Sequence, residues 1–193
     1  MRTLLATILF VMAAAAVLPA QGKTFLTTKE ALALAFPDCK IERQRHVLND
    51  AKKKRVLKLS GEKPCRSMVI AYQATKNGKV VGTAYFDRHR VRSQRELVMI
   101  VVDPKNKVRR IEVISFGEPL DYLPRGRFYA QFVGKGLKDK LSTKGAIRGV
   151  VGATLTVNAT ANAVRRVLAT HQVLFEKPVR SPTVAKKVTP TRT

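Results

Sequence analysis

The sequence has no tryptophan, only two cysteines and three histidines, and few acidic residues. The cysteines and histidines are scattered without the spacing of metal ligands, so the sequence predicts no metal site. It also lacks a Walker or Rossmann glycine pattern, a defensible Ser-His-Asp order and a supported pair of carboxylates. These absences argue against a stand-alone enzyme with catalytic side chains of its own.

The shortage of acidic residues leaves a large excess of positive charge. Lysine and arginine total 37 against 13 aspartates and glutamates in 193 residues, which gives a formal net charge of +24. A field of this sign attracts nucleic acid, an anionic membrane surface or an acidic protein partner. The compartment of the protein decides among these partners.

The first residues indicate export. Arg2 precedes an uncharged apolar stretch from Leu4 to Leu18, and small residues with one proline follow it. This is the layout of a secretory signal peptide, and about 15 apolar residues are short for a spanning helix, which needs about 20. We expect a signal peptide at residues 1–22 and a periplasmic or envelope-associated protein, with an uncleaved anchor as the alternative. Export argues against a nucleic-acid partner.

Export also bears on the two cysteines, Cys39 and Cys65. In an oxidising compartment a bridge between them would close a loop of about 25 residues and stabilise the fold by about 3 kcal/mol. The alternative is two free thiols, and we favour the disulfide.

Periodicity and turn residues predict an α+β fold, a mostly antiparallel sheet flanked by helices in a single domain. The dipeptide Asn77-Gly78 indicates a tight hairpin. The domain covers residues 23–175, and the basic tail at 176–193 is predicted to be disordered. We expect helices over residues 26–36, 48–57, 127–132 and 157–173, and strands over 40–47, 67–74, 80–86, 96–103 and 108–116.

A glycine-containing turn precedes the last predicted helix. Gly152 and Ala153 keep the backbone approachable, and Thr154 and Thr156 offer hydroxyls. The start of a helix presents unpaired N–H groups that favour anions, phosphate above all. One hydroxyl can cap the helix while the other meets a phosphate; the alternative is an ordinary threonine-capped helix after a glycine turn.

The segment Gly152-Ala153-Thr154-Leu155-Thr156 matches the Gly-Ala-Thr-x-Thr core of a known family. Through it the chain resembles the FMN-binding domain family, which includes flavoprotein subunits of sodium-pumping NADH:quinone reductases and of Rnf-type electron-transfer complexes. Further traces, among them residues 82–92, 118–124 and 163–166, resemble a group of small exported FMN-binding domain proteins. The resemblance implies FMN as cofactor, joined through its phosphate to Thr154 by a separate flavin transferase.

Two other places are candidate cofactor contacts. The charged run at 87–92 follows an apolar strand. We expect it to form a loop near the flavin, with His89 as a contact and with cations that stabilise the phosphate or the reduced flavin ring; a solvated basic connection is the alternative. Glu118 lies where the family has a loop close to the flavin ring, with a surface glutamate as the alternative. The aromatic residues of the short helix at 127–132 are interpreted as core rather than as ring-stacking residues.

These expectations combine into an exported flavoprotein that carries electrons, with Gly152, Ala153, Thr154, Leu155 and Thr156 at the cofactor together with the two residues above. Its expected partners are redox proteins with acidic surfaces, a flavin transferase and an anionic membrane surface. Val151 and Arg148 stand where the family usually has Ser or Thr and often Asp, so non-covalent FMN binding stays open. The alternative is a flavin-free envelope binding or structural module with the same fold and a basic docking surface.

Overall fold

The computed structural model describes residues 22–175, and both the basic tail and the predicted signal peptide, apart from Gly22, lie outside this range. The described chain forms one six-stranded antiparallel sheet with helices packed on both faces, which confirms the α+β prediction. The strand order is β1-β6-β5-β4-β3-β2, so the sheet from β2 to β6 is a simple meander. Its strands are β1 (Lys23–Thr24), β2 (Lys40–Val47), β3 (Met68–Lys76), β4 (Lys79–Arg90), β5 (Arg95–Val102) and β6 (Val108–Phe116).

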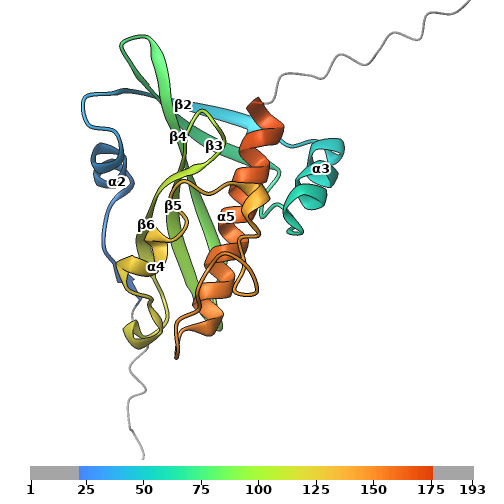
Figure 1. Cartoon of the computed structure of the whole chain (residues 1–193). Helices are drawn as coiled ribbons and strands as arrows, with labels where there is room; N and C mark the ends of the chain where they lie inside the picture. Colours follow the sequence, from blue (N-terminus) through green and yellow to red (C-terminus); the bar gives the residue numbers. More distant parts are fainter. Residues whose placement is uncertain (1–21, 176–193) are drawn as a thin grey trace, which may run out of the picture.

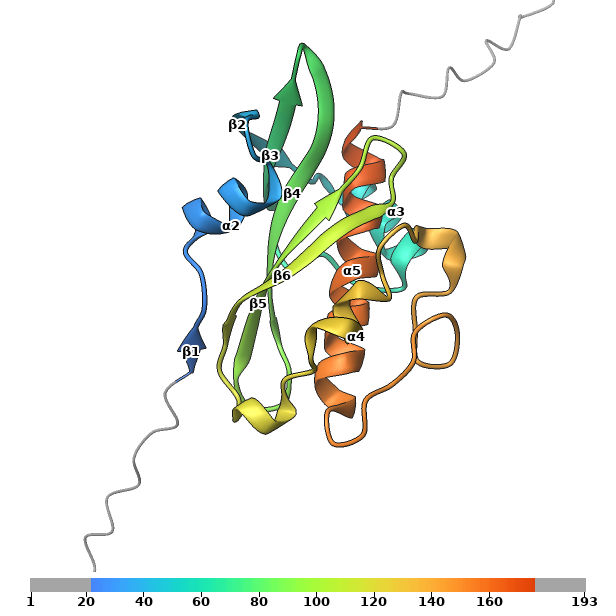
Figure 2. The same ribbon diagram turned by 60° about the vertical axis from the view of Figure 1, so that its left-hand side comes forward.

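Helices form two layers, one on each side of the sheet (Figures 1 and 2). The long helix α5 (Thr154–Phe175) packs on one face, and its Val157, Val164 and Leu168 join Val98 and Ile100 of β5 in the larger core. The helix α3 (Asp50–Ser60) lies beside α5. On the opposite face α2 (Thr28–Ala35) covers a smaller core.

Local sequence explains the ends of these elements. Thr27 caps α2 through a reciprocal arrangement with Glu30, in which each side chain accepts a hydrogen bond from the other residue's backbone N–H. Asn77 and Gly78 both have positive φ, 52° and 74°, as a two-residue hairpin between β3 and β4 requires. The short helix α4 (Gly126–Ala130) buries Phe128, so its interpretation as core is confirmed.

Among the boundaries that differ from the sequence prediction, two affect the site. Strand β4 continues to Arg90 instead of ending at residue 86, because β5 pairs with it as far as Arg90 opposite Arg95. Helix α5 begins at Thr154 rather than at 157, so the predicted motif enters its first turn. The loop after β6 contains a short 3₁₀ turn, Leu120–Tyr122.

The predicted disulfide is wrong, since both cysteines are free. Cys39 precedes one end of β2, whereas Cys65 lies near the other end, where the Leu48 amide donates to the carbonyl of Ser67. A strand of eight residues separates the two ends by about 25 Å, far beyond the reach of a disulfide.

Candidate functional site

A groove of about 160 Å³ lies at the N-terminal end of α5. Three segments distant in sequence form its walls: the turn between β4 and β5, the loop after β6, and the turn that leads into α5. The lining residues are Val91, Arg92, Glu118, Tyr122, Gly152, Ala153, Thr154, Leu155 and Thr156. The structure therefore brings Glu118 and all five residues of the predicted motif into one site.

The turn before α5 presents backbone N–H groups to the groove. Gly152 has φ +82°, a conformation that a residue with a Cβ rarely adopts, and the amide of Ala153 donates to the carbonyl of Val150. The helix then begins, and its first intrahelical bond in this turn runs from the Val157 amide to the Ala153 carbonyl. The amides of residues 154–156 have no partner one turn earlier in the helix, so they present donors at its positive end.

The two threonines of the motif have different roles. Thr156 is buried, and its hydroxyl donates to the carbonyl of Tyr122 at 2.7 Å, which ties the loop after β6 to the first turn of α5. Thr156 is therefore not the helix cap that the sequence allowed. Thr154 is exposed, and its hydroxyl makes no hydrogen bond to any described residue. Thr154 thus offers the free hydroxyl of the groove.

Glu118 is buried in the opposite wall of the groove, where it organises the β4–β5 turn. Its Oε1 accepts hydrogen bonds from the amides of Arg92, Ser93 and Gln94 at 3.2, 2.6 and 2.7 Å. These backbone donors, with that of Gln94 foremost, lower the pKa of the Glu118 carboxyl. Glu118 therefore acts through the turn that it holds, while its predicted contact with a cofactor stays a prediction.

Arg92 is the cation of the groove; the sequence predicts cations of the run 87–92 near the flavin but indicates His89 as the contact. It is exposed, it lines the groove, and its guanidinium makes no hydrogen bond to a described residue. The signal available in the sequence was its place at the end of the charged run 87–92. A guanidinium opposite free helix amides and a free hydroxyl is a donor set suited to a phosphate.

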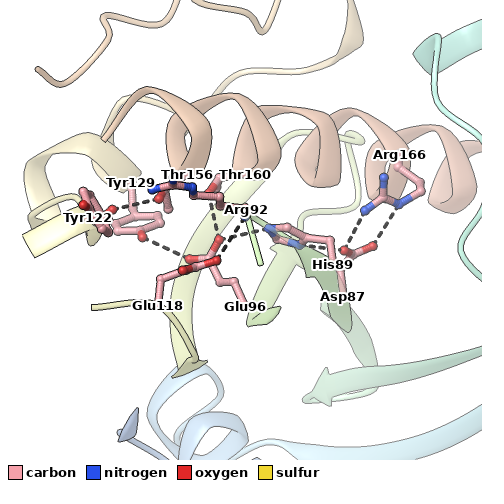
Figure 3. A network of polar contacts seen from close by, with 10 residues as sticks. All are labelled: Asp87, His89, Arg92, Glu96, Glu118, Tyr122, Tyr129, Thr156, Thr160 and Arg166. Carbon is pink, nitrogen blue, oxygen red and sulfur yellow. Dashed lines mark hydrogen bonds and ion pairs between the residues drawn. The ribbon is translucent and has the colours of Figure 1, made fainter. Parts of the chain in front are cut away.

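His89 belongs to strand β4 instead of a loop, and its side chain lies between the sheet and α5 (Figure 3). Because β4 extends to Arg90, Asp87 and His89 point toward α5 as residues of a strand, so the loop and the solvated connection expected for them are both wrong. His89 Nδ1 lies 3.0 Å from Asp87 Oδ1, and its Nε2 lies 2.9 Å from Glu96 Oε2. With both ring nitrogens engaged, His89 is not among the residues that line the groove.

These contacts belong to a buried network along α5, shown in Figure 3. Arg166 of α5 makes a bidentate ion pair with Asp87, with Nε and Nη2 at 3.0 and 2.7 Å from the two carboxylate oxygens. Glu96, fully buried, also accepts hydrogen bonds from the hydroxyls of Tyr129 and Thr160. The network therefore fastens α5 to β4 and β5.

Charge balance explains how this network stays buried. Burial alone would lower the pKa of His89, but the carboxylates of Asp87 and Glu96 outweigh it and raise that pKa to about 9. Burial likewise opposes the Asp87 carboxylate, yet His89 and Arg166 hold its pKa below the usual value. His89 is therefore a protonated structural group at neutral pH.

Residues 22–175 contain neither a group of metal-binding side chains nor a helix suited to crossing a membrane. No three or more His, Cys, Asp or Glu side chains are grouped so that they could hold a metal ion. No helix of this range is long and apolar enough to cross a membrane.

The comparisons with known proteins identify one family. Residues 95–169, from the start of β5 into α5, match the model of the FMN-binding domain family. This segment contains Glu118 and the whole motif at 152–156, so the match to the FMN-binding domain family covers most of the residues that line the groove. No match was found among curated proteins or among solved structures.

Proposed function

We propose that this protein is an exported electron carrier whose FMN is held in the groove and joined through its phosphate to Thr154. The FMN-binding domain at residues 95–169 supports FMN as the cofactor. The observation that supports the position and linkage of FMN is that the free Thr154 hydroxyl, the first amides of α5 and Arg92 meet in one groove.

The donor set of the groove fits the phosphate end of FMN. Unpaired helix amides and a guanidinium bind a phosphate dianion, and a free hydroxyl at the same point is placed to become its ester oxygen. The groove measures about 160 Å³, whereas sites that enclose a whole cofactor-sized ligand measure about 300–1,000 Å³. The groove therefore suits the phosphate and leaves the larger part of the cofactor over the surrounding surface.

The rim of the groove is apolar and exposed, and this supports a carrier rather than an enzyme with an enclosed substrate pocket. Tyr122 and Leu155 line the groove and are exposed. FMN, when bound, supplies one- or two-electron redox chemistry, and the protein supplies binding and electrostatics. A redox centre on an open surface can approach partner proteins, and the basic surface would attract acidic partners or an anionic membrane face at rates that fall with salt.

The two departures from the family motif lie on the outer side of the turn. Val151 is fully exposed. The side-chain amide of Gln131 donates to the carbonyl of Arg148 and accepts from its backbone N–H, which fixes the backbone there. The side chains at these positions therefore do not shape the loop, although a flavin transferase would meet both of them. They favour the second candidate, a flavin-free envelope module of the same fold.

The test is the intact mass and absorption spectrum of the protein produced together with a flavin transferase. The unaltered protein is expected to be yellow and to keep the mass of one FMN phosphoester after denaturation. Thr154→Ala should lose the added mass, while Thr143→Ala, at another exposed threonine, should keep it. Retention of the mass in Thr154→Ala would refute the linkage, and a colourless protein that does not bind added FMN would favour the flavin-free module.

A further inference from the structure

A second cavity lies where the sheet opens between β3 and β4. The two strands pair from Lys76 opposite Lys79 to Ala71 opposite Tyr85, and there the pairing ends. Beyond it, residues 68–70 of β3 pair only with β2, and residues 86–90 of β4 pair only with β5. The sheet therefore splits into two arms with no strand between them.

The space between the arms is a cavity of about 360 Å³, which we call the β3–β4 cavity. One wall consists of Met68, Val69 and Ile70, and the other includes Phe86. The α3–β3 loop and the middle of α5 close it on the side of the larger core. This volume falls within the range of small-molecule sites, at about 300–1,000 Å³.

The β3–β4 cavity has an apolar body and a positively charged polar lining. Arg166 is only 8% exposed and lines the cavity. It uses Nε and Nη2 on Asp87, and its Nη1 makes no hydrogen bond to a described residue. Arg66 and Arg88, both exposed, also line the cavity and form no ion pair within the described residues. The lining therefore contains three arginines and one carboxylate, Asp87, which is already paired.

From this lining we infer that the β3–β4 cavity binds a small organic anion, with its apolar body between Ile70 and Phe86 and its acidic group at the three arginines. The arginines supply charge-assisted donors for a carboxylate, sulfonate or phosphate. The apolar walls supply the burial that holds a ring or a short chain.

This site is separate from the groove that we assign to FMN. Thr154 and Arg166 are twelve residues apart on α5, which corresponds to about 18 Å along the helix axis. The inference does not depend on the proposed function, because a flavin-free protein would contain the same cavity.

The test uses 8-anilinonaphthalene-1-sulfonate, an aromatic anion, as the probe of the full chain at 0.15 M salt. Calorimetric titration of the unaltered protein should show saturable one-to-one binding. Arg88→Gln, a change at an exposed position, should weaken binding about fivefold, since it removes one charged donor. Ile70→Trp, which fills the space between the arms, should weaken it by more than about tenfold.

Two controls separate the cavity from general surface effects. Arg127→Gln removes the same charge from an exposed position of α4 outside the cavity and should leave the affinity unchanged. N-phenyl-1-naphthylamine, a related aromatic probe without the acidic group, should bind the unaltered protein and Arg88→Gln equally. The inference is overturned if the unaltered protein shows no saturable binding, if Arg127→Gln weakens binding as much as Arg88→Gln, or if folded Ile70→Trp binds normally. Should Ile70→Trp fail to fold, the comparison of Arg88→Gln with Arg127→Gln decides.

Discussion

Replacing His89 by glutamine tests the buried network that fastens α5 to the sheet. The imidazolium lies between the carboxylates of Asp87 and Glu96, at 3.0 and 2.9 Å. Glutamine keeps a hydrogen-bond donor of similar size but carries no positive charge. It therefore leaves Asp87 with Arg166 and leaves Glu96 without a cationic partner among the described residues. Breaking a buried ion pair in this way costs about 3–5 kcal/mol.

The same contacts give the free energy of unfolding a definite pH dependence. The folded protein raises the pKa of His89 to about 9, from an ordinary value of 6.5 in the unfolded chain. The folded state thus binds this proton more tightly, so the stabilisation is complete below pH 6.5 and is lost as the pH rises through 9. A difference of about 2.5 pH units at 1.36 kcal/mol per unit amounts to about 3 kcal/mol.

The assay is urea unfolding followed by far-ultraviolet circular dichroism between pH 6 and 9.5. The unaltered protein should lose about 3 kcal/mol of unfolding free energy over this range. His89→Gln should be less stable by about that amount at pH 6.5 and should show a much flatter curve, so that the two proteins converge near pH 9.5. His46→Gln, at a half-buried histidine of β2, should keep the alkaline decline. An equally steep decline in His89→Gln would refute the assignment of the raised pKa to His89.

Two further predictions concern α5 and the groove. Burial lowers the pKa of His171 to about 4, and its Nδ1 lies 2.8 Å from the hydroxyl of Tyr85, so stability should fall as the pH drops from 6.5 toward 4. Thermal melting at pH 7 and pH 5 should show this loss in the unaltered protein and a smaller loss in His171→Gln. Arg92→Gln should weaken FMN binding about tenfold in protein made without the transferase, since it removes a charged contact to the phosphate. Flavin fluorescence quenching measures this affinity, and an unchanged affinity would exclude Arg92 from the phosphate site.

Local signals in the sequence were enough to predict most of the fold. The Asn77-Gly78 turn, the alternation of the strands and the apolar spacing of the last helix each act over a few residues, and the structure has the expected elements there. The exceptions depend on tertiary contacts. The end of β4 could not be predicted, because Asp87 and His89 read as surface residues until Glu96 and Arg166 supply their partners. The disulfide failed for a similar reason, since sequence separation does not show that β2 holds the two cysteines apart.

A local sequence pattern predicted only one side of the candidate site, while Glu118 and the run at 87–92 on the other side were expected from the family resemblance. The segment at 152–156 has a local signature, a glycine turn that leads into a helix, and the structure forms that turn. The opposite wall comes from the β4–β5 turn. No local pattern shows that Glu118 accepts hydrogen bonds from the amides of this turn, those of residues 92–94. Thr156 illustrates the same limit, because its partner is the carbonyl of Tyr122, 34 residues earlier in the chain.

The buried charges explain how a groove formed by separate segments keeps its geometry. Apolar contacts between α5 and the sheet are non-directional, and a well-packed apolar substitute for an ion pair is often at least as stable. The bidentate ion pair between Arg166 and Asp87, however, can form only when α5 lies at one position along its axis relative to β4. Slippage by one turn would move Thr154 about 5.4 Å relative to Arg92, which would separate the hydroxyl from the cation across the groove. The network thus contributes to the site by fixing the helix that carries Thr154, although none of its charged side chains lines the groove.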